Sequence, residues 1–310
     1  MTLTEFRYIV AVARERHFGR AAEACYVSQP TLSVGVKKLE EQLGITLFER
    51  SKSDVKVTPE GEPIIEQAQR ILEQVGQMKQ LAKQNSDQLD GPLKVGAIFT
   101  IGPYLLPSLI PMLRTLAPKM PLHIDEDYTH NLRTKLRNGE LDAIFIALPF
   151  DEPEVDVIPL YQEEFTALLP AKHPWVKKDK LHILDIADEV MIMLGAGHCF
   201  RDQVIEACPQ CQDNSLNPQK DWITGSSIET IRQMVASGLG VSVIPNSAAD
   251  YHNDKLGLVT RTFDDPKPSR RVALAFRRSF PRKQAIELIQ QALQQITISG
   301  AQPLPNTTTS

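Results

Sequence analysis

Cysteines are the side chains of this sequence most able to do chemistry, and three of the four fall between residues 199 and 211. Cys199 stands between His198 and Arg201 at the apparent start of a helix, and Cys208 follows nine residues later. Helix N-termini and nearby cations lower the pKa of a thiol, and the thiolate is the form that attacks peroxide. The pattern predicts a redox switch in which Cys208 resolves an oxidised Cys199 before irreversible over-oxidation.

The spacing of these two cysteines predicts a mechanical consequence. A helix over residues 200–207 rises about 1.5 Å per residue and would hold the two Cα atoms roughly 13 Å apart. A disulfide needs Cα atoms within about 7 Å. Forming the bond therefore requires the helix between them to unwind or move, which supplies distinct reduced and oxidised shapes.

Three other interpretations of the cysteines stay open. They could be buried and inert, because free cysteine often serves packing alone. His198, Cys199, Cys208 and Cys211 also offer the ligand count of a structural zinc site, although adjacent His and Cys rarely converge on one ion. Cys208 and Cys211 together form a Cys-x-x-Cys pair, which a thiol-disulfide oxidoreductase would use as its dithiol.

Length, charge and hydropathy bound the architecture that must position this switch. A chain of 310 residues predicts two or three domains. The net charge of -4 argues against a protein that coats nucleic acids nonspecifically. Any DNA binding must therefore depend on particular residues and not on the overall charge. The first residues lack a signal-peptide pattern and no apolar run is long enough to span a bilayer. We therefore expect a cytoplasmic protein, not a secreted solute-binding protein.

Residues 1–58 carry the pattern of short helices joined by a tight turn. Thr4 is expected to cap the first helix, Ser28 to cap a later one, and Pro30 fits the first turn of that later helix. A basic hairpin, or wing, is expected over residues 50–57. The pattern predicts a winged helix-turn-helix that reads a DNA major groove. The residues expected to contact DNA are Ser28, Gln29, Pro30, Thr31, Ser33, Lys37, Lys38, Arg50 and Lys52.

The alternative is that the polar face of the predicted recognition helix is an ordinary solvent-exposed face. Charge does not decide between the two, because residues 1–60 hold nine Lys or Arg against eight Asp or Glu. A linker helix over residues 59–90, with Thr58 before it and Pro59 at its first position, is predicted next. Its apolar residues alternate in steps of four and three, which suits a partner helix or its own domain. They are Ile64, Ala68, Ile71, Val75, Met78 and Ala82.

Residues 91–300 alternate apolar strand patterns with helical ones, which predicts α/β units around mostly parallel sheets. We expect strands at 93–98, 141–146, 165–169 and 272–276. The tail over residues 301–310 is rich in Pro, Thr and Ser and is predicted to be disordered.

Several motifs closely resemble LysR-type transcriptional regulators. They are Phe18-x-x-Ala21-Ala22, Val27-Ser28-Gln29-Pro30-x-x-Ser33, Leu39-Glu40, Leu43-Gly44-x-x-Leu47-Phe48-x-Arg50 and Thr58-x-x-Gly61. The resemblance implies a winged helix-turn-helix, a long linker helix and an α/β effector domain of two lobes, similar to periplasmic binding proteins. The second lobe would span about 165–265. A regulator of this family that responds to a small organic inducer between the lobes is the alternative function.

The segment from Gly197 to Gln203, with Cys208, closely resembles the peroxide-sensing members of this family. The resemblance implies a homotetramer that binds a double-stranded operator, engages RNA polymerase, activates antioxidant genes and is re-reduced by a cellular dithiol such as glutaredoxin. Hydrogen peroxide would be consumed stoichiometrically, so neither an enzyme nor a cofactor is expected. The residues expected to bind peroxide or stabilise the thiolate are Thr100, Thr129, His198, Arg201, Asp202 and Arg270.

Overall fold

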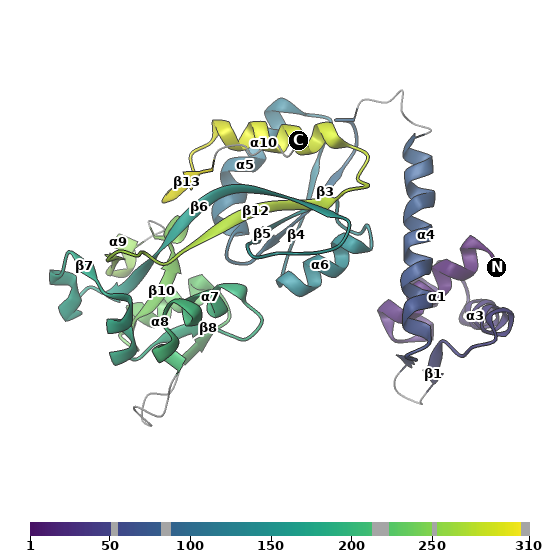
Figure 1. Cartoon of the computed structure of the whole chain (residues 1–310), viewed down its shortest axis with the longest axis horizontal. Coiled ribbons are helices and arrows are strands. Elements are labelled where there is room, and N and C mark those ends of the chain that lie inside the picture. The colour runs from purple at the N-terminus through teal and green to yellow at the C-terminus, as the bar shows by residue number, and fades with distance from the viewer. Residues whose placement is uncertain (51–54, 82–87, 213–222, 250–252, 305–310) are drawn as a thin grey trace. The chain divides into compact units, whose positions relative to one another are not determined.

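The computed structural model describes residues 1–50, 55–81, 88–212, 223–249 and 253–304 (Figure 1). A few side chains within these ranges, among them those of Arg50 and Cys211, also lie outside the description. The chain divides into two compact units, Met1–Ser86 and Asp87–Ser310. Among the described residues, every helix is too short or too polar to cross a bilayer.

The first unit is a three-helix core with a two-stranded wing and a long final helix. Its elements are α1 (Leu3–Glu15), α2 (Phe18–Ala24), α3 (Gln29–Leu43), β1 (Phe48–Arg50), β2 (Val55–Val57) and α4 (Gly61–Leu81). The wing strands pair antiparallel.

Side-chain caps set where these helices begin. Ser28 caps α3 as predicted, because its Oγ accepts a hydrogen bond from the Thr31 backbone N at 3.3 Å. The prediction for α1 is wrong: Thr2, and not Thr4, is the cap. Thr2 Oγ1 accepts from the Glu5 backbone N while the Glu5 carboxylate accepts from the Thr2 backbone N, a reciprocal pair that fixes the start of the helix.

The linker helix α4 begins later than predicted. Thr58 Oγ1 accepts from the Gly61 backbone N at 3.0 Å and donates to the Thr46 carbonyl at 2.7 Å, so Pro59 lies in a turn before the helix. Ala68 is buried in the core of the first unit, whereas Met78, further along the same seam, is 69% exposed. Only the first part of the seam is covered by its own domain.

The second unit is built on a nine-stranded mixed sheet in the order β4-β3-β5-β12-β6-β11-β7, with β10 and β13 also paired to β6. The strands are β3 (Leu93–Ile98), β4 (Leu122–Asp127), β5 (Ala143–Ala147), β6 (Val155–Pro170), β7 (Lys180–Leu181), β10 (Ser242–Pro245), β11 (Leu258–Phe263), β12 (Ser269–Arg277) and β13 (Ala301–Pro303), and a small second sheet pairs β8 (Ile192–Leu194) with β9 (Ile223–Gly225). The helices are α5 (Gly102–Leu116), α6 (Thr129–Arg137), α7 (Cys199–Ala207), α8 (Ile228–Ala236), α9 (Asn253–Leu256) and α10 (Lys283–Gln295), with short 3-10 turns η1 (Pro174–Lys177), η2 (Ile183–Asp188), η3 (Pro209–Gln212) and η4 (Asn246–Ala248).

The prediction of mostly parallel sheets is wrong for the strands that join the lobes. β3 is parallel to β4 and β5, but β12 is antiparallel to both β5 and β6, and β6 is antiparallel to β10 and β11. The reason is that β6 and β12 pass from one lobe to the other in opposite directions (Figure 1). Both lobes therefore contain antiparallel as well as parallel strand pairs.

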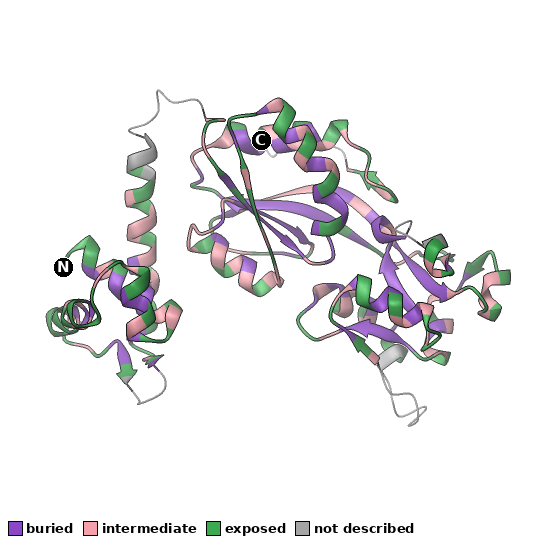
Figure 2. Cartoon of the chain, turned by 180° about the vertical axis from the view of Figure 1, so that it is seen from behind, coloured by how far each residue is buried: buried purple, intermediate pink, exposed green. Residues whose placement is uncertain are grey.

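Two apolar cores form the two lobes. The first gathers side chains of β3, β5, β12, α5 and α10, and the second gathers side chains from Phe165 to Phe263 together with Tyr104 of α5. Figure 2 shows the buried residues concentrated along the strands of the sheet.

The prediction of a disordered tail over residues 301–310 is wrong for its first residues. Ala301 pairs with Glu163 and Pro303 with Tyr161, and the Leu304 backbone N donates to the Leu160 carbonyl at 3.0 Å. This short strand gains backbone hydrogen bonds on an open edge of β6, which composition does not reveal. Residues 305–310 lie outside the described residues.

Candidate functional site

Helix α7 spans the distance between the two predicted redox cysteines. Cys199 is its first residue and Cys208 is its C-cap, whose backbone N still donates to the Val204 carbonyl at 2.9 Å. The predicted helix between the cysteines is confirmed. At about 1.5 Å per residue it separates the two Cα atoms by roughly 13 Å, so a disulfide between them requires the helix to unwind.

The same helix lies where the lobes meet. Phe200 and Val204 are buried in the second-lobe core, whereas the half-buried Cys199 packs against the first-lobe core. Gln203 Nε2 donates to the Leu148 carbonyl of the first lobe at 3.1 Å. Unwinding α7 would therefore break contacts between the lobes.

A small cavity of about 10 Å³ lies beside Cys199 and joins four of the predicted site residues. Thr100 and Thr129 come from the first lobe, and His198 and Cys199 come from the second. A volume near 10 Å³ accommodates one water-sized molecule. The residues that line it are Ile98, Phe99, Thr100, Asp127, Tyr128, Thr129, Gly197, His198 and Cys199.

Two buried polar atoms at this cavity lack a hydrogen-bond partner among the residues that the structure describes. They are Thr129 Oγ1 and His198 Nε2. Buried polar atoms are almost always hydrogen-bonded, because leaving one unpaired costs about 1–3 kcal/mol. The cavity therefore suits a small neutral molecule that both donates and accepts hydrogen bonds.

His198 is not the cation that the sequence predicted beside Cys199. Burial lowers its pKa, and a hydrogen bond to the Ser226 backbone opposes this only in part. Its ring meets Tyr128 edge-on, with centroids 4.8 Å apart. The hydrogen bond to the Ser226 backbone raises the pKa, so the imidazole ring is its donor. The neutral ring then leaves its unpartnered nitrogen, Nε2, as a hydrogen-bond acceptor.

Arg270 reaches the site through Thr100. It is 3% exposed, and its guanidinium donates to Thr100 Oγ1 and to the Thr100 carbonyl, both at 2.8 Å. Its Cζ lies 5.1 Å from the centroid of the Phe200 ring. Since Thr100 Oγ1 accepts from a cation, its own hydroxyl hydrogen is left to donate toward the cavity.

Glu163, which sequence reasoning missed, holds Arg270 in place. Its Oε1 accepts from Arg270 Nε at 2.7 Å and its Oε2 accepts from the Ser247 backbone N at 3.1 Å, with the carboxylate 1% exposed. The pair is formed by register partners on β6 and β12. The sequence did hold a signal for this pair. Glu163 stands two residues before the predicted buried strand at 165–169, and a carboxylate buried beside such a strand needs a cation as its partner.

Arg201 and Asp202 do not line the cavity, so their predicted role in binding peroxide or stabilising the thiolate stays a prediction. Arg201 lines a different small cavity, with Phe200 and Ile231 in the second-lobe core, and Asp202 is exposed in the first turn of α7. Helix geometry explains the difference, because residues two and three positions after Cys199 project about 200° and 300° around the axis.

Cys208 is fully buried in the second-lobe core and is disulfide-bonded in this structure. Cys199 and Cys25 are both free thiols, so this bond is not the predicted one to Cys199. The side chain of Cys211 lies outside the described residues. Within the part of the chain that the structure describes, no three His, Cys, Asp or Glu residues are placed to hold a metal ion.

The exposed face of α3 carries most of the predicted DNA-contacting residues. Ser28, Gln29, Pro30 and Thr31 are exposed at its start, and Ser33 is half-buried. The side chain of Arg50 and all of Lys52 lie outside the described residues.

Both predicted lysines of α3 carry an ion pair with a carboxylate of the chain. Lys37 pairs with Glu41 at 3.7 Å and Lys38 with Glu5 at 3.4 Å, and the two lysine side chains are 72% and 59% exposed. The Lys37–Glu41 pair is exposed on both sides and contributes little to stability, so the Lys37 ammonium can exchange it for another anion. The Glu5 carboxylate beside Lys38 is only 7% exposed, so Lys38 neutralises a buried charge. Sequence reasoning missed Val34 on the same helix, which is 68% exposed.

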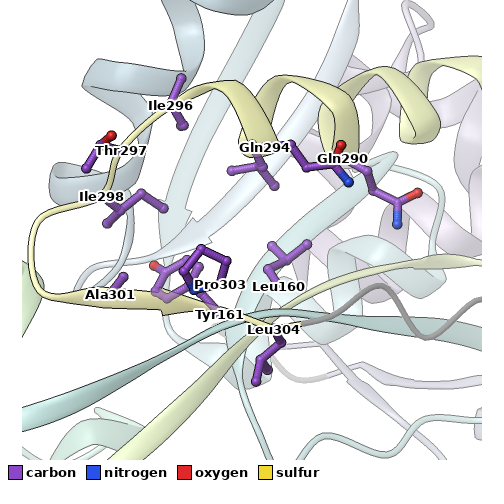
Figure 3. A pocket seen from close by; sticks show the side chains of 11 residues that line it. Leu160, Tyr161, Gln290, Gln294, Ile296, Thr297, Ile298, Ala301, Pro303 and Leu304 are labelled. Carbon is purple, nitrogen blue, oxygen red and sulfur yellow. The ribbon is translucent and has the colours of Figure 1, made fainter.

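A cavity of about 400 Å³ lies away from all of these residues, under α10 and β13 (Figure 3). Its walls hold Gln290 and Gln294, one helical turn apart, and apolar side chains such as Leu160 and Ile298. No ionisable acid or base other than the Tyr161 phenol lines it. It takes no part in the chemistry at Cys199.

Two family descriptions together match most of the chain. "Bacterial regulatory helix-turn-helix protein, lysR family" matches residues 3–62, and "LysR substrate binding domain" matches residues 86–297. The predicted fold class, a winged helix-turn-helix and linker helix before a two-lobed α/β domain, is confirmed.

Relatives and solved structures agree with these matches. The chain is 36% identical over 293 residues to the DNA-binding transcriptional dual regulator OxyR of Escherichia coli (strain K12), covering 94% of this chain and 95% of that one. It is also 36% identical over 281 residues to a hydrogen peroxide-inducible genes activator of Pectobacterium carotovorum subsp. carotovorum, covering 91% and 92%.

Among solved structures, full-length OxyR from Pseudomonas aeruginosa with a cysteine-to-aspartate substitution is similar, with a TM-score of 0.80 and 54% identity over 97% of this chain and 98% of that one. A cysteine-to-serine variant of OxyR from Corynebacterium glutamicum, bound to H2O2, has a TM-score of 0.63 and 35% identity over 95% and 92%.

Proposed function

We propose that this chain, which belongs to the LysR family of bacterial transcriptional regulators, senses hydrogen peroxide through Cys199 and converts the oxidation into altered operator binding. The observation that carries the proposal is the pair of unpartnered atoms, Thr129 Oγ1 and His198 Nε2, among the described residues that line a water-sized cavity beside the free Cys199. The names of the relatives and the H2O2 bound in the Corynebacterium structure support the same oxidant.

The first chemical step oxidises Cys199 and reduces one peroxide. The Cys199 thiolate attacks one peroxide oxygen, the O–O bond breaks, and the second oxygen leaves as hydroxide, which takes up a proton to form water. Thr129 and His198 hold the oxidant, and Thr100, polarised by Arg270, donates to the leaving oxygen.

The second step forms the disulfide. A Cys208 thiolate attacks the sulfenic sulfur of Cys199, hydroxide leaves, and the two sulfurs bond. Cys208 reacts in its reduced form, and a cellular dithiol such as glutaredoxin supplies the electrons that restore this form. Each oxidation event consumes one peroxide per pair of cysteines, and the same reductant resets the switch afterwards. We propose that this consumption serves sensing and that the chain is not an enzyme.

The same proposal covers organisation and partners. Residues 1–58 bind the operator, residues 59–90 dimerise, and residues 91–300 sense peroxide, in a cytoplasmic homotetramer that engages RNA polymerase to activate antioxidant genes. The exposed Met78 end of α4 supports the dimer, because an apolar seam is left uncovered there by the described residues of its own unit.

Peptide mass spectrometry tests the proposal. The fully reduced chain is treated with one equivalent of H2O2, and its DNA footprint is recorded beside the peptide map. We expect Cys199 sulfenic acid, then a Cys199-Cys208 link, with a shifted footprint.

Matched cysteine variants complete this experiment. Cys199→Ser should abolish both the link and the shift, whereas Cys25→Ser should leave both intact. If peroxide converts the fully reduced chain to a product with a Cys208-Cys211 link while Cys199 stays reduced, the proposed roles are wrong. A wild-type footprint that is the same with and without H2O2 would favour an organic inducer between the lobes instead.

A further inference from the structure

Helix α3 places an apolar side chain at the centre of its exposed face. Leu32, Val36 and Leu39 are fully buried and share one side of the helix. At 100° per residue, Val34 lies about 170° from the middle of that buried stripe. Val34 is 68% exposed, so it stands at the point of α3 most distant from the protein core.

A proline, a threonine and two lysines surround Val34 on the same face. Pro30 and Thr31 lie one turn before it, and Lys37 and Lys38 lie one turn after it, all exposed. Lys37 is 72% exposed and its pair with Glu41 is exposed on both sides, so a phosphate can replace that carboxylate. Lys38 is 59% exposed and adds a second ammonium group to this edge while it pairs with the buried Glu5. The face therefore has an apolar centre beside a cationic edge, which complements a groove floor bordered by phosphates.

We propose that Val34 packs against the C5-methyl group of a thymine in the major groove and so selects an A·T pair at one position of each operator half-site. The inference rests on the proposed DNA-binding function and adds which base α3 selects. Thymine is the standard base that presents a methyl group in the major groove. Valine offers no hydrogen bond there, so it discriminates through burial of that methyl and through shape.

Replacing single thymines with deoxyuridine tests this inference, because uracil lacks only the methyl group. The full chain first selects its operator from random duplexes, and its affinity for singly substituted copies is then measured by fluorescence anisotropy at fixed salt. Losing one buried methyl should weaken binding about fourfold at one thymine in each half-site.

A variant at residue 34 makes the test specific. Val34→Ala should bind the unsubstituted operator about fourfold more weakly and should lose its sensitivity to deoxyuridine at that thymine only. Thr31→Ala, one turn away, is the matched control, which should retain that sensitivity whatever its affinity. Val34 is exposed and alanine favours a helix, so Val34→Ala should be at least as stable to heat as wild type and should oxidise at Cys199 at the wild-type rate.

The outcomes separate two kinds of failure. If Val34→Ala keeps the full response to every deoxyuridine, or if no thymine of the operator responds, the thymine contact is wrong while DNA binding stands. If the wild-type chain selects no duplex from the random pool, the DNA-binding function itself fails.

Discussion

The protonation state of His198 decides whether its Nε2 can accept a hydrogen bond in the cavity beside Cys199. Burial lowers the pKa of His198, so the folded protein keeps the imidazole neutral and its Nε2 able to accept a hydrogen bond. In the unfolded chain the same group titrates near about 6.5. Between the two pKa values the unfolded chain binds a proton that the folded chain lacks, so stability rises with pH across that window.

We therefore expect acid to destabilise the folded protein partly through His198. The free energy of unfolding should fall as pH drops from about 6.5 through the lowered folded pKa of this group. Denaturant unfolding of the full chain, repeated with His198→Asn, measures the effect, because the variant should show a shallower loss below about pH 6.5. The exposed Gln233→Ala, which changes no titratable group, serves as the control and should match the wild-type slope.

The buried pair of Glu163 and Arg270 makes a second prediction for single residues. Glu163→Ala leaves the Arg270 guanidinium buried without its counter-ion and should cost about 3–5 kcal/mol of stability. Replacing both residues with Met removes the uncompensated charge, so the double variant should unfold at a higher temperature than Glu163→Ala. A double variant as unstable as the sum of the two single ones would contradict this account of the pair.

Among secondary-structure elements, α7 opposes the formation of the disulfide between Cys199 and Cys208. Its helical hydrogen bonds must break before the two sulfur atoms can meet. Lowering the stability of α7 should speed disulfide formation. Glu206 is exposed near its end, and glycine costs a helix about 1 kcal/mol relative to alanine. The reduced Glu206→Gly chain should form the Cys199-Cys208 link about fivefold faster than Glu206→Ala after one equivalent of peroxide. Equal rates in quenched time courses would show that unwinding does not limit the reaction.

Elements were predictable from the sequence where local chemistry sets them. Ser28 followed by Pro30 marks the start of α3, and the run after Cys199 marks α7, because caps and apolar periodicity act within a few residues. β13 was missed because its pairing partner, β6, lies more than 130 residues earlier in the chain. The neutral state of His198 was missed for a similar reason, since the burial that causes it comes from Phe99 and Tyr128 of the other lobe.

For the whole molecule, the linker helix predicts how copies associate. Met78 lies on the apolar seam of α4 and is 69% exposed, so a charge there should disturb a partner helix and not the fold of its own unit. Met78→Glu should lower the mass in sedimentation equilibrium and weaken binding to a two-site operator more than to a half-site. Met78→Leu, which keeps the seam apolar, should behave as wild type, and both variants should oxidise at the wild-type rate.

Connectivity between the lobes was the part of the molecule least accessible to sequence reasoning. Alternating strands and helices indicated α/β units, but periodicity within one segment cannot tell that β6 continues from one lobe into the next. The prediction of mostly parallel sheets failed at β6 and β12 for that reason. Resemblance to a family supplied Thr100, Thr129 and Arg270, which no local pattern would have brought together.

The small volume beside Cys199 also determines which oxidants the protein ignores. At about 10 Å³ the space holds a molecule near the size of water. An alkyl hydroperoxide offers the same oxygen pair, but it also carries a carbon chain that a space of this size does not hold. Hydroperoxides of fatty acids should therefore not oxidise Cys199. A cell would need a different sensor protein, with a larger space beside its thiol, to detect oxidised lipids.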